Sequence, residues 1–268
     1  MEKQVSLQNG NIHYRSKGLG SAVVLLHGFM ENHTIWDDFS DVLSRNYLVI
    51  GIDLPGHGKS DLFGEIHSMD FMAEAVGAVL DQEKVKRCIM VGHSMGGYVT
   101  LAFARKYAER LNGIVLFHSQ AAADDEQGKI NRNRTIDIVK GDHGSFIHAF
   151  VPTLFCEDTV KEFSREIEML TAQSVKMPVQ GITAALAGMR DRQDSRELLA
   201  KLNVPVLFII GKKDEKIPLE KIMDQLPLPA NSEALIIDNI GHMGFLESRD
   251  LTLKALEHFV ERNSVEED

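Results

Sequence analysis

The stretch from Gly92 to Gly97 carries the clearest chemical signal in the chain. It reads Gly-His-Ser-Met-Gly-Gly and lies between an apolar run typical of a strand and a pattern typical of a helix. A strand, a Gly-x-Ser-x-Gly turn and a helix in this order describe a nucleophile elbow, which lifts the serine hydroxyl into open space. The tight turn requires residues without a large side chain at positions 92 and 96. We therefore predict that Ser94 is a catalytic nucleophile.

A serine hydroxyl needs a general base, usually histidine, and the histidine needs a carboxylate that orients it. Asp214 follows the apolar run Val204–Ile210, and His242 follows the run Ala234–Ile237. Both runs predict strands, and ligands of open parallel sheets bind at the carboxyl ends of the strands. We therefore predict that His242 is the base and that Asp214 orients it.

The negative charge that develops during attack needs two hydrogen-bond donors. The backbone N–H of Met95 lies at the start of a predicted helix, where unpaired donors and the helix dipole favour such a charge. We assign the second donor to the backbone N–H of Phe29, in the loop that follows the predicted strand Ser21–Leu26. Because the amide does this work, the Phe29 side chain remains available to line the pocket.

The elements that must position these groups alternate between strand and helix. A hairpin is predicted around Asn9-Gly10-Asn11, followed by strands at Ser21–Leu26, Leu48–Ile52, Arg87–Val91 and Ile114–Phe117, with helices at Ile35–Leu43, Met69–Leu80 and Tyr98–Ala108 between them. This rhythm predicts an α/β fold, a mostly parallel sheet with helices on both faces.

The rhythm changes near Ala121. From Asp124 to Gly188 we find no strand, and four short amphipathic helices are predicted at Ile130–Val139, Phe146–Val151, Val160–Thr171 and Pro178–Ala187. The alternation then resumes with the strands that precede Asp214 and His242 and with helices at Leu219–Gln225 and Leu251–Arg262. We therefore expect a core formed by residues 1–120 and 189–268, with a helical cap, residues 121–188, inserted after the sixth strand.

Composition narrows the classes of partner. The net charge is −10 without a long basic block, which argues against nucleic acid or an anionic membrane as the main partner. The two cysteines, Cys88 and Cys156, are too few for a disulfide framework, and the N-terminus has no apolar signal core. We expect a cytoplasmic protein, and no residue is predicted to bind a metal.

These motifs resemble those of the α/β-hydrolase superfamily, in its cap-bearing esterase and C–C hydrolase branch. The likeness covers nearly the whole core and rests on His27-Gly28-Phe29, Asp53 to Ser60, Gly92 to Gly97, Gly211 to Asp214 and Gly241-His242. The order Ser94, Asp214, His242 is also the order of this superfamily. The resemblance implies an eight-stranded sheet, a cap between the sixth and seventh strands, and no cofactor. Some members carry the acid after the sixth strand, so Asp124 and Asp125 remain rivals of Asp214.

Several residues of the cap and its surroundings are candidates for contact with a substrate. The candidates for an apolar pocket, any one of which is more often a simple core residue, are Phe146, Phe150, Leu154, Phe155, Met189 and Met243. Arg190 lies near the return to the core, where some C–C hydrolases carry a substrate-binding arginine. Beside Asp191 and Arg192, a solvated surface position is the favoured interpretation.

The identity of the predicted nucleophile narrows the classes of reaction that this chain can catalyse. The similar haloalkane dehalogenases and epoxide hydrolases use aspartate at the position of Ser94. The similar C–C hydrolases usually carry asparagine and tryptophan where this chain has His93 and Met243. The His-Ser-Met pattern is more like that of carboxylesterases, monoacylglycerol lipases and cofactor-free perhydrolases. We therefore expect hydrolysis of a small to medium, largely apolar carboxylic ester through an acyl-enzyme. Hydrolysis of a C–C bond in a vinylogous diketone, or a ligand receptor on a hydrolase scaffold, remain alternatives.

Overall fold

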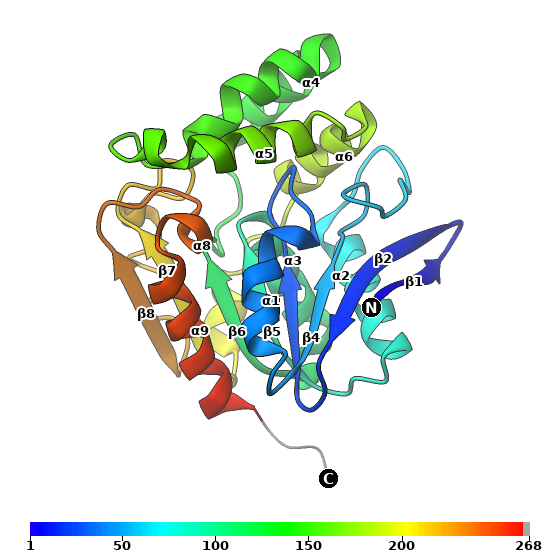
Figure 1. Cartoon of the computed structure of the whole chain (residues 1–268), viewed down its shortest axis with the longest axis vertical. Coiled ribbons are helices and arrows are strands. Elements are labelled where there is room, and N and C mark those ends of the chain that lie inside the picture. The colour runs from blue at the N-terminus through cyan, green and yellow to red at the C-terminus, as the bar shows by residue number, and fades with distance from the viewer. Residues whose placement is uncertain (265–268) are drawn as a thin grey trace.

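Eight strands form a single sheet in the computed structural model, which describes residues 1–264. The strands are β1 Glu2–Leu7, β2 Gly10–Lys17, β3 Ala22–Leu26, β4 Leu48–Ile52, β5 Cys88–His93, β6 Leu111–Phe117, β7 Val206–Gly211 and β8 Ser232–Ile237. Their order across the sheet is β1-β2-β4-β3-β5-β6-β7-β8 (Figure 1). β2 pairs antiparallel with β1 and β4, and the other neighbouring strands are parallel. The predicted fold class is confirmed.

The helices surround this sheet. They are α1 Asp37–Leu43, α2 Met69–Gln82, α3 Met95–Tyr107, α4 Glu126–Phe150, α5 Ser164–Ser174, α6 Val179–Arg190, α7 Arg196–Lys201, α8 Gly244–Glu247 and α9 Arg249–Asn263. Short 3₁₀ turns occur at His33–Trp36, Ala108–Arg110, Val151–Leu154, Val160–Phe163 and Leu219–Lys221. Within residues 1–264, none of the helices has the length and apolar character that crossing a membrane would require.

The central strands are buried on both faces because successive side chains of a strand point in opposite directions. In β3, Val24 and Leu26 contribute to one hydrophobic core, whereas Val23 and Leu25 contribute to the other. Residues of α2 and α3 complete the first core, and residues of α1 and α9 complete the second. The nearly continuous apolar runs of the sequence therefore reflect helices on both sides of the sheet.

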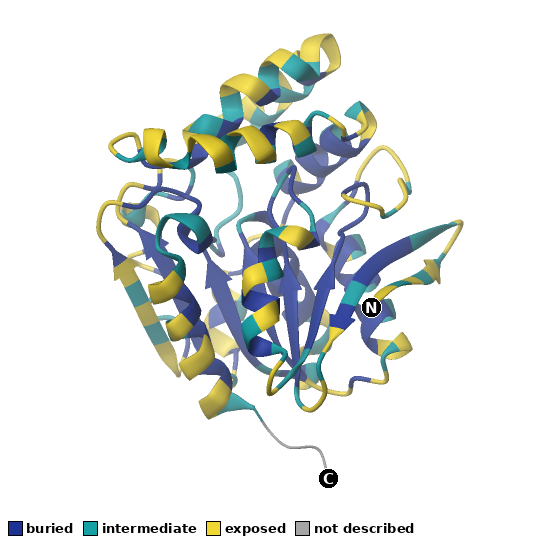
Figure 2. Cartoon of the chain, in the orientation of Figure 1, coloured by how far each residue is buried: buried dark blue, intermediate teal, exposed yellow. Residues whose placement is uncertain are grey.

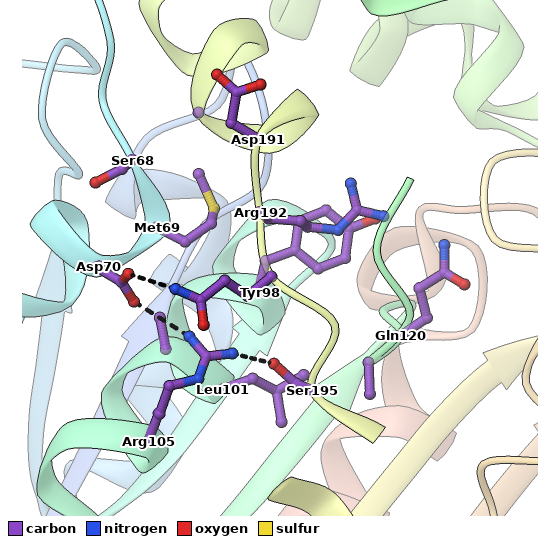
Figure 3. A pocket seen from close by; sticks show the side chains of 14 residues that line it. Ser68, Met69, Asp70, Tyr98, Leu101, Arg105, Gln120, Asp191, Arg192 and Ser195 are labelled. Atoms are coloured by element: carbon purple, nitrogen blue, oxygen red, sulfur yellow. Dashed lines mark hydrogen bonds and ion pairs between the residues drawn. The ribbon is translucent and has the colours of Figure 1, made fainter. Parts of the chain in front are cut away.

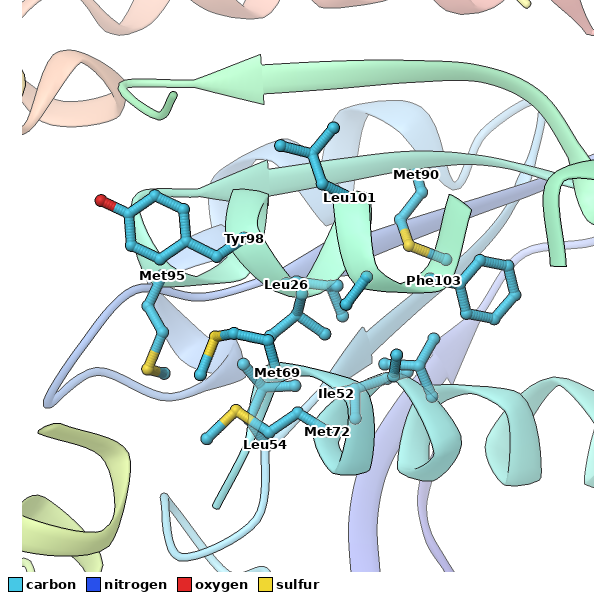
Figure 4. Packing of buried hydrophobic residues seen from close by; sticks show 14 of the residues in the cluster. Leu26, Ile52, Leu54, Met69, Met72, Met90, Met95, Tyr98, Leu101 and Phe103 are labelled. Atoms are coloured by element: carbon cyan, nitrogen blue, oxygen red, sulfur yellow. The ribbon is translucent and has the colours of Figure 1, made fainter. Parts of the chain in front are cut away.

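The first core lies between the sheet and the pair α2 and α3. Figure 4 shows Phe103 and Met95 on the side of α3 that faces Met72 of α2 and Ile52 of β4, with Leu101 on the opposite side of the helix. Phe103 and Met72 are fully buried. Because this core holds α3 against the sheet, it also fixes the start of α3, where the elbow lies.

A helical insertion follows β6, as predicted. α4, α5 and α6 lie across the end of the sheet toward which the parallel strands point, and their outward faces are exposed (Figures 1 and 2). The two helices expected around residues 130–139 and 146–151 form one long element that breaks at Asp142, where φ is −154° and ψ is 85°. The Asp142 carboxylate accepts the N–H of Ser145 at 3.0 Å, which caps the second half. α6 continues to Arg190, beyond the expected cap boundary at residue 188.

Two glycines let α6 approach the core closely. A Cβ atom at Gly181 would overlap the backbone of Gly56, and one at Gly188 would overlap the backbone of His67. The N–H of His67 also donates to the carbonyl oxygen of Ala184 at 3.0 Å. This end of the insertion is therefore tied to the core by backbone contacts.

Some short elements differ from expectation. The prediction of a helix at Leu219–Gln225 is wrong, because only the 3₁₀ turn Leu219–Lys221 forms there. Pro218 precedes the turn and Pro227 follows it, and each proline removes a backbone donor, so little chain remains for a longer helix. α7 and α8 were not predicted, since four to six residues are too few to establish a helical period.

The first core predicts the effect of truncating Phe103. Phe103→Ala should lower the free energy of unfolding by about 3–5 kcal/mol, because it removes a fully buried ring and leaves a cavity. Urea denaturation followed by circular dichroism measures this change. Leu251→Ala, at a side chain that is 47% exposed, serves as control and should change the value by less than about 0.5 kcal/mol. Equal effects of the two substitutions would contradict this account of the core.

Candidate active site

Ser94 has a strained backbone conformation at the end of β5. Its φ and ψ angles are 50° and −112°, between His93 and the start of α3 at Met95. Such a conformation costs on the order of 1–3 kcal/mol for a residue with a side chain, so the surroundings must hold it. The N–H of Ser94 donates to the carbonyl oxygen of Phe117 at 2.9 Å, and the Ser119 hydroxyl donates to the carbonyl oxygen of Ser94 at 2.8 Å. β6 and the residues after it therefore anchor the turn.

Space at this turn requires glycine. A Cβ atom at Gly92 would overlap the backbone of Gly96, and one at Gly97 would overlap the Ser119 side chain. A Cβ atom at Gly96 would lie 2.6 Å from the carbonyl oxygen of Leu26 in β3, closer than real Cβ atoms approach. The predicted requirement for small residues at positions 92 and 96 is therefore confirmed, and position 97 shares it.

The structure brings the predicted acid and base together. His242 Nδ1 lies 2.8 Å from Asp214 Oδ2, and both side chains are buried. Asp214 follows β7 and His242 follows β8, and these neighbouring strands are parallel, so their carboxyl ends meet at one edge. The other Asp214 oxygen, Oδ1, accepts the N–H groups of Lys216 and Ile217 at 2.8 and 2.9 Å.

Asp214 is held as a carboxylate. Burial alone would raise its pKa, but the charge of His242 and the hydrogen bonds from His118 and His242 outweigh burial and hold the pKa of Asp214 well below its usual range. Because an ionised carboxylate only accepts hydrogen bonds, the proton in its bond with His242 resides on Nδ1. His242 Nε2 is then left as the atom that can take a proton from a substrate or from a serine.

A second histidine contacts the same oxygen of Asp214. His118 follows β6 with a φ of 48°, and its Nδ1 lies 3.0 Å from Asp214 Oδ2. Burial lowers the pKa of His118 to about 4, against the opposing effect of Asp214, so the ring is neutral at pH 7 with its proton on Nδ1. Asp214 is therefore fixed from two sides. No periodicity or motif in the sequence indicates this role of His118, because it depends on a residue 96 positions away.

The rival acids lie elsewhere. Asp124 pairs with Arg192 at 2.7 Å and with Arg132 at 3.0 Å. Asp125 caps α4, since its carboxylate accepts the N–H of Gly128 at 2.7 Å. Neither of them shares a hydrogen bond with His242, so the geometry favours Asp214.

Two backbone donors remain free beside the turn. Within residues 1–264, the N–H groups of Phe29 and Met95 donate to no protein acceptor. Met95 is the first residue of α3, whose N-terminal N–H groups have no acceptor within the helix. These are the two donors predicted from the sequence, and both remain available to a negatively charged oxygen.

A buried pair, Glu31 and His93, connects the surrounding segments. Glu31 Oε2 accepts the N–H of Gly28 at 2.6 Å and faces His93 Nδ1 at 3.0 Å. His93 Nε2 lies 3.0 Å from the backbone carbonyl oxygen of His242. One side chain thus joins the loop of Phe29, the residue before the predicted nucleophile and the loop of the predicted base.

The partners of His93 determine its charge. One ring nitrogen faces a carboxylate oxygen and the other a carbonyl oxygen, so both nitrogens must carry a proton. Burial alone would lower the pKa of His93, but the charge and hydrogen bond of Glu31 raise it above its ordinary value. Burial would likewise raise the pKa of Glu31, and the charge and hydrogen bond of His93 lower it. The pair is therefore an imidazolium and a carboxylate. No motif in the sequence indicates it, because the two residues lie 62 positions apart.

Three aromatic rings lie in a row between the core and the insertion. The rings of Phe146 and Phe150 are stacked with centroids 5.4 Å apart, and Phe150 meets Phe29 edge to face at 6.2 Å. The N–H of His242 donates to the carbonyl oxygen of Leu154 at 2.7 Å, so the segment after α4 also contacts the predicted base. The predicted contact of Phe146, Phe150 and Leu154 with substrate stays a prediction.

The other candidates for contact with substrate either already bind protein groups or are buried; they are Arg190, Met189, Met243 and Phe155. Arg190 uses its guanidinium for Asp191 and for Asn133, each at 2.7 Å. Met189 and Met243 are buried, and Met243 belongs to the core that contains Trp36. Phe155 is buried against Phe163, with ring centroids 5.6 Å apart. Arg190 would have to exchange these partners to bind a substrate.

A small polar cavity of about 50 Å³ lies beside α3, near the segment that returns from the insertion (Figure 3). Arg105 contacts Asp70 at 3.2 Å and Ser195 at 2.6 Å, and the Arg192 guanidinium lies 4.2 Å from the ring centroid of Tyr98. The guanidinium groups of Arg105 and Arg192 are thus already paired, the first with Asp70 and Ser195 and the second with the Tyr98 ring of α3. The cavity has room for little more than water, and its lining ties the returning segment to the core.

Among residues 1–264, two groups of side chains have the spacing of metal ligands: His13 with His33 and Asp53, and His118 with Asp214 and His242. In the first group, the Nδ1 atoms of His13 and His33 contact Asp53 at 3.0 and 2.7 Å. Asp53 also accepts the N–H of Lys59 at 2.9 Å, which holds the loop after β4. Hydrogen bonding accounts for the spacing in both groups, and the second group consists of the predicted acid and base together with His118.

The sheet order, the elbow and the loops after β7 and β8 define an α/β hydrolase. The chain belongs to the alpha/beta hydrolase fold family, whose model matches residues 21–248. It is 28% identical over 249 residues to the pimeloyl-[acyl-carrier protein] methyl ester esterase of Aeromonas hydrophila, with 91% of this chain and 96% of that protein covered.

Solved structures of two esterases are similar over nearly the whole chain. A thermophilic esterase from Thermogutta terrifontis, with malate bound, is 29% identical with a TM-score of 0.92 and covers 99% of this chain and 100% of that one. An esterase from Exiguobacterium antarcticum is 26% identical with a TM-score of 0.85, covering 94% of this chain and 96% of that one.

The Glu31 and His93 pair predicts a pH-dependent loss of stability. Glu31→Ala should lower the free energy of unfolding by about 3–5 kcal/mol, because it leaves a buried imidazolium without its partner. The contribution of a lowered carboxyl pKa is complete above 4.5 and is lost as pH falls through the folded value. That of a raised imidazole pKa is complete below 6.5 and is lost as pH rises through the folded value.

The difference between wild type and Glu31→Ala should therefore be largest between pH 4.5 and 6.5. Urea denaturation across this range measures it. Glu65→Ala, at an exposed acid, is the control and should show little difference at any pH. A difference that does not vary with pH would contradict the charged pair.

Proposed function

We propose that this protein is a carboxylic ester hydrolase that works through an acyl-enzyme, with Ser94 as nucleophile, His242 as general base and Asp214 as its orienting acid. The observation that carries the proposal is the strained Ser94 turn beside a buried Asp214 and His242 pair. The hydrogen bond from His93 to the His242 carbonyl oxygen holds the base loop against the residue next to Ser94. The three esterases reported above support the same class of reaction.

In the first half-reaction, Ser94 Oγ bonds to the ester carbonyl carbon while His242 Nε2 takes the hydroxyl proton. The negative charge on the carbonyl oxygen is stabilised by the N–H groups of Phe29 and Met95. His242 then returns the proton to the alkoxy oxygen as the C–O bond breaks, and an alcohol leaves. Asp214 stabilises the imidazolium that exists between these proton transfers.

In the second half-reaction, water replaces the alcohol. His242 takes one proton from water while its oxygen bonds to the acyl carbon, and the same two N–H groups stabilise the oxyanion. The bond to Ser94 Oγ then breaks, and His242 returns the proton to the serine. The products are a carboxylic acid and the regenerated enzyme.

The proposal keeps the expected division into a core, residues 1–120 and 189–268, and a cap, residues 121–188. The aromatic row of Phe29, Phe150 and Phe146 supports a substrate with apolar parts between cap and core. Both cysteines are free and buried, which fits the proposed cytoplasmic location.

Removing the Ser94 hydroxyl tests this function. Ser94→Ala should lower kcat for p-nitrophenyl butyrate by about 10⁴-fold or more, because the residual donors cannot replace a nucleophile. Wild type should also release a burst of p-nitrophenol equal to the enzyme concentration whenever deacylation is slower than acylation. Ser164→Ala, at an exposed serine of the insertion, is the matched control and should retain activity. Turnover by Ser94→Ala equal to that of wild type would refute the assignment.

A further inference from the structure

Lys216 presents a half-buried ammonium group without a counter-ion. Within residues 1–264, its Nζ atom has no hydrogen bond and no ion pair with a carboxylate. Asp214, two residues earlier, is fully committed, since both of its oxygens already accept hydrogen bonds. Glu215 is exposed and makes no ion pair with Lys216. The Lys216 ammonium therefore has solvent and the aromatic ring of Phe150 beside it instead of a carboxylate.

The position of this group is set from two sides. Its own backbone N–H donates to Asp214 Oδ1 at 2.8 Å, which fixes the start of the side chain against the acid of the predicted triad. At the other end, Nζ lies 5.2 Å from the ring centroid of Phe150 in α4. Lys216 thus extends from the core to the insertion that covers it.

The Phe150 ring leads toward the reaction centre. It meets the ring of Phe29 edge to face, with centroids 6.2 Å apart, and the N–H of Phe29 is one of the two free donors. The ammonium of Lys216, the ring of Phe150 and the ring of Phe29 therefore form one continuous wall. Under the proposed function, a substrate whose carbonyl oxygen is bound by the Phe29 N–H would extend along these side chains.

A cation in this setting is incompletely stabilised. Partial burial removes water from the ammonium, and burial lowers the pKa of Lys216 against the opposing charges of Glu215 and Asp214. The contact with Phe150 replaces only part of the lost hydration, since cation–π contacts are individually weak. A carboxylate that enters beside Phe150 would gain a charge-assisted hydrogen bond without displacing a protein partner.

We propose that Lys216 binds an anionic group of the substrate, so that the preferred esters carry a free carboxylate in addition to the ester bond. The proposal rests on the proposed function and deepens it, because it adds a charged subsite to an otherwise apolar pocket. Two kinds of ester present this chemistry. In a half-ester of a dicarboxylic acid the carboxylate belongs to the acyl part, and in an ester of a hydroxy acid it belongs to the alcohol part.

The test compares charged esters with neutral ones of similar size. One arm pairs monomethyl succinate with methyl butyrate, and the other pairs acetoxyacetate with propyl acetate. In Lys216→Met, kcat/KM for the charged member of at least one pair should fall about tenfold or more, mainly through KM, because a charge-assisted bond is lost. The neutral members should change less than about twofold. The arm that responds tells whether the acyl or the alcohol part carries the carboxylate.

Two further variants separate charge from structure. Lys216→Arg keeps the cation and should retain most of the preference for the charged ester, whereas Lys216→Glu should lose more than Lys216→Met. Lys212→Met removes a cation from the same loop, where Lys212 pairs with exposed Asp238 at 2.7 Å, and should leave the preference unchanged. Equal losses for charged and neutral esters in Lys216→Met, or no loss in either arm, would overturn the proposal.

A binding measurement tests the Lys216 subsite independently of the proposed reaction. Succinate and glycolate, the carboxylate products of the two arms, are titrated calorimetrically into wild type and Lys216→Met. Weaker binding of either one to the variant supports the subsite. This conclusion holds even if neither ester is turned over, an outcome that would refute the hydrolase proposal but not the subsite. Equal binding of both to the two proteins, together with unchanged ester preference, refutes the subsite and leaves the Ser94 assignment intact.

Discussion

The steric constraint at Ser94 is the condition on which the rest of the site depends. A residue with a side chain is held at a φ of 50°, and α3 starts immediately after it against β3 and β5. Only glycine at positions 92, 96 and 97 leaves room for this approach. The strain is sustained because Phe117 at the end of β6 and Ser119 just after it bind the turn, and because the core around Phe103 holds α3 in place. The packing energy of the domain thus maintains the half-buried Ser94 in a fixed backbone conformation.

Two buried histidines next to this turn have opposite protonation states, and the reason is the number of acceptors around each ring. His93 faces acceptors with both nitrogens and is an imidazolium paired with Glu31. His118 faces a carboxylate with one nitrogen only, and its Nε2 has no partner within residues 1–264, so it is neutral. The charged ring ties three loops together, while the neutral ring steadies Asp214 without adding a second positive charge beside His242, the proposed base. Hydrogen-bond geometry, more than burial, distinguishes the two.

The core and the insertion contribute different groups to the site. The groups proposed to carry out bond making and breaking all follow strands of the core, where the sheet fixes them. Groups that would discriminate between substrates lie where α4 meets the core, in the ring of Phe150 and the ammonium of Lys216. Because few residues of α4 are buried, its sequence is less constrained by packing than that of the sheet. One reaction can therefore be combined with different substrate pockets on the same core.

The sequence alone determined the succession of strands along the chain, the elbow and the insertion after β6, and it predicted the partners of Ser94, because glycine spacing, apolar runs and residues at strand ends are local signals. It overestimated the helix at Leu219–Gln225, where prolines left room for one turn. Only the tertiary structure joined Glu31 to His93 across 62 positions, His118 to Asp214 across 96, and Lys216 to Phe150. Such contacts have no periodicity, since they arise when loops from different strands meet at one edge of the sheet. The physical reason is that local sequence sets the backbone, whereas the protonation and the partners of a buried side chain depend on the folded chain around it.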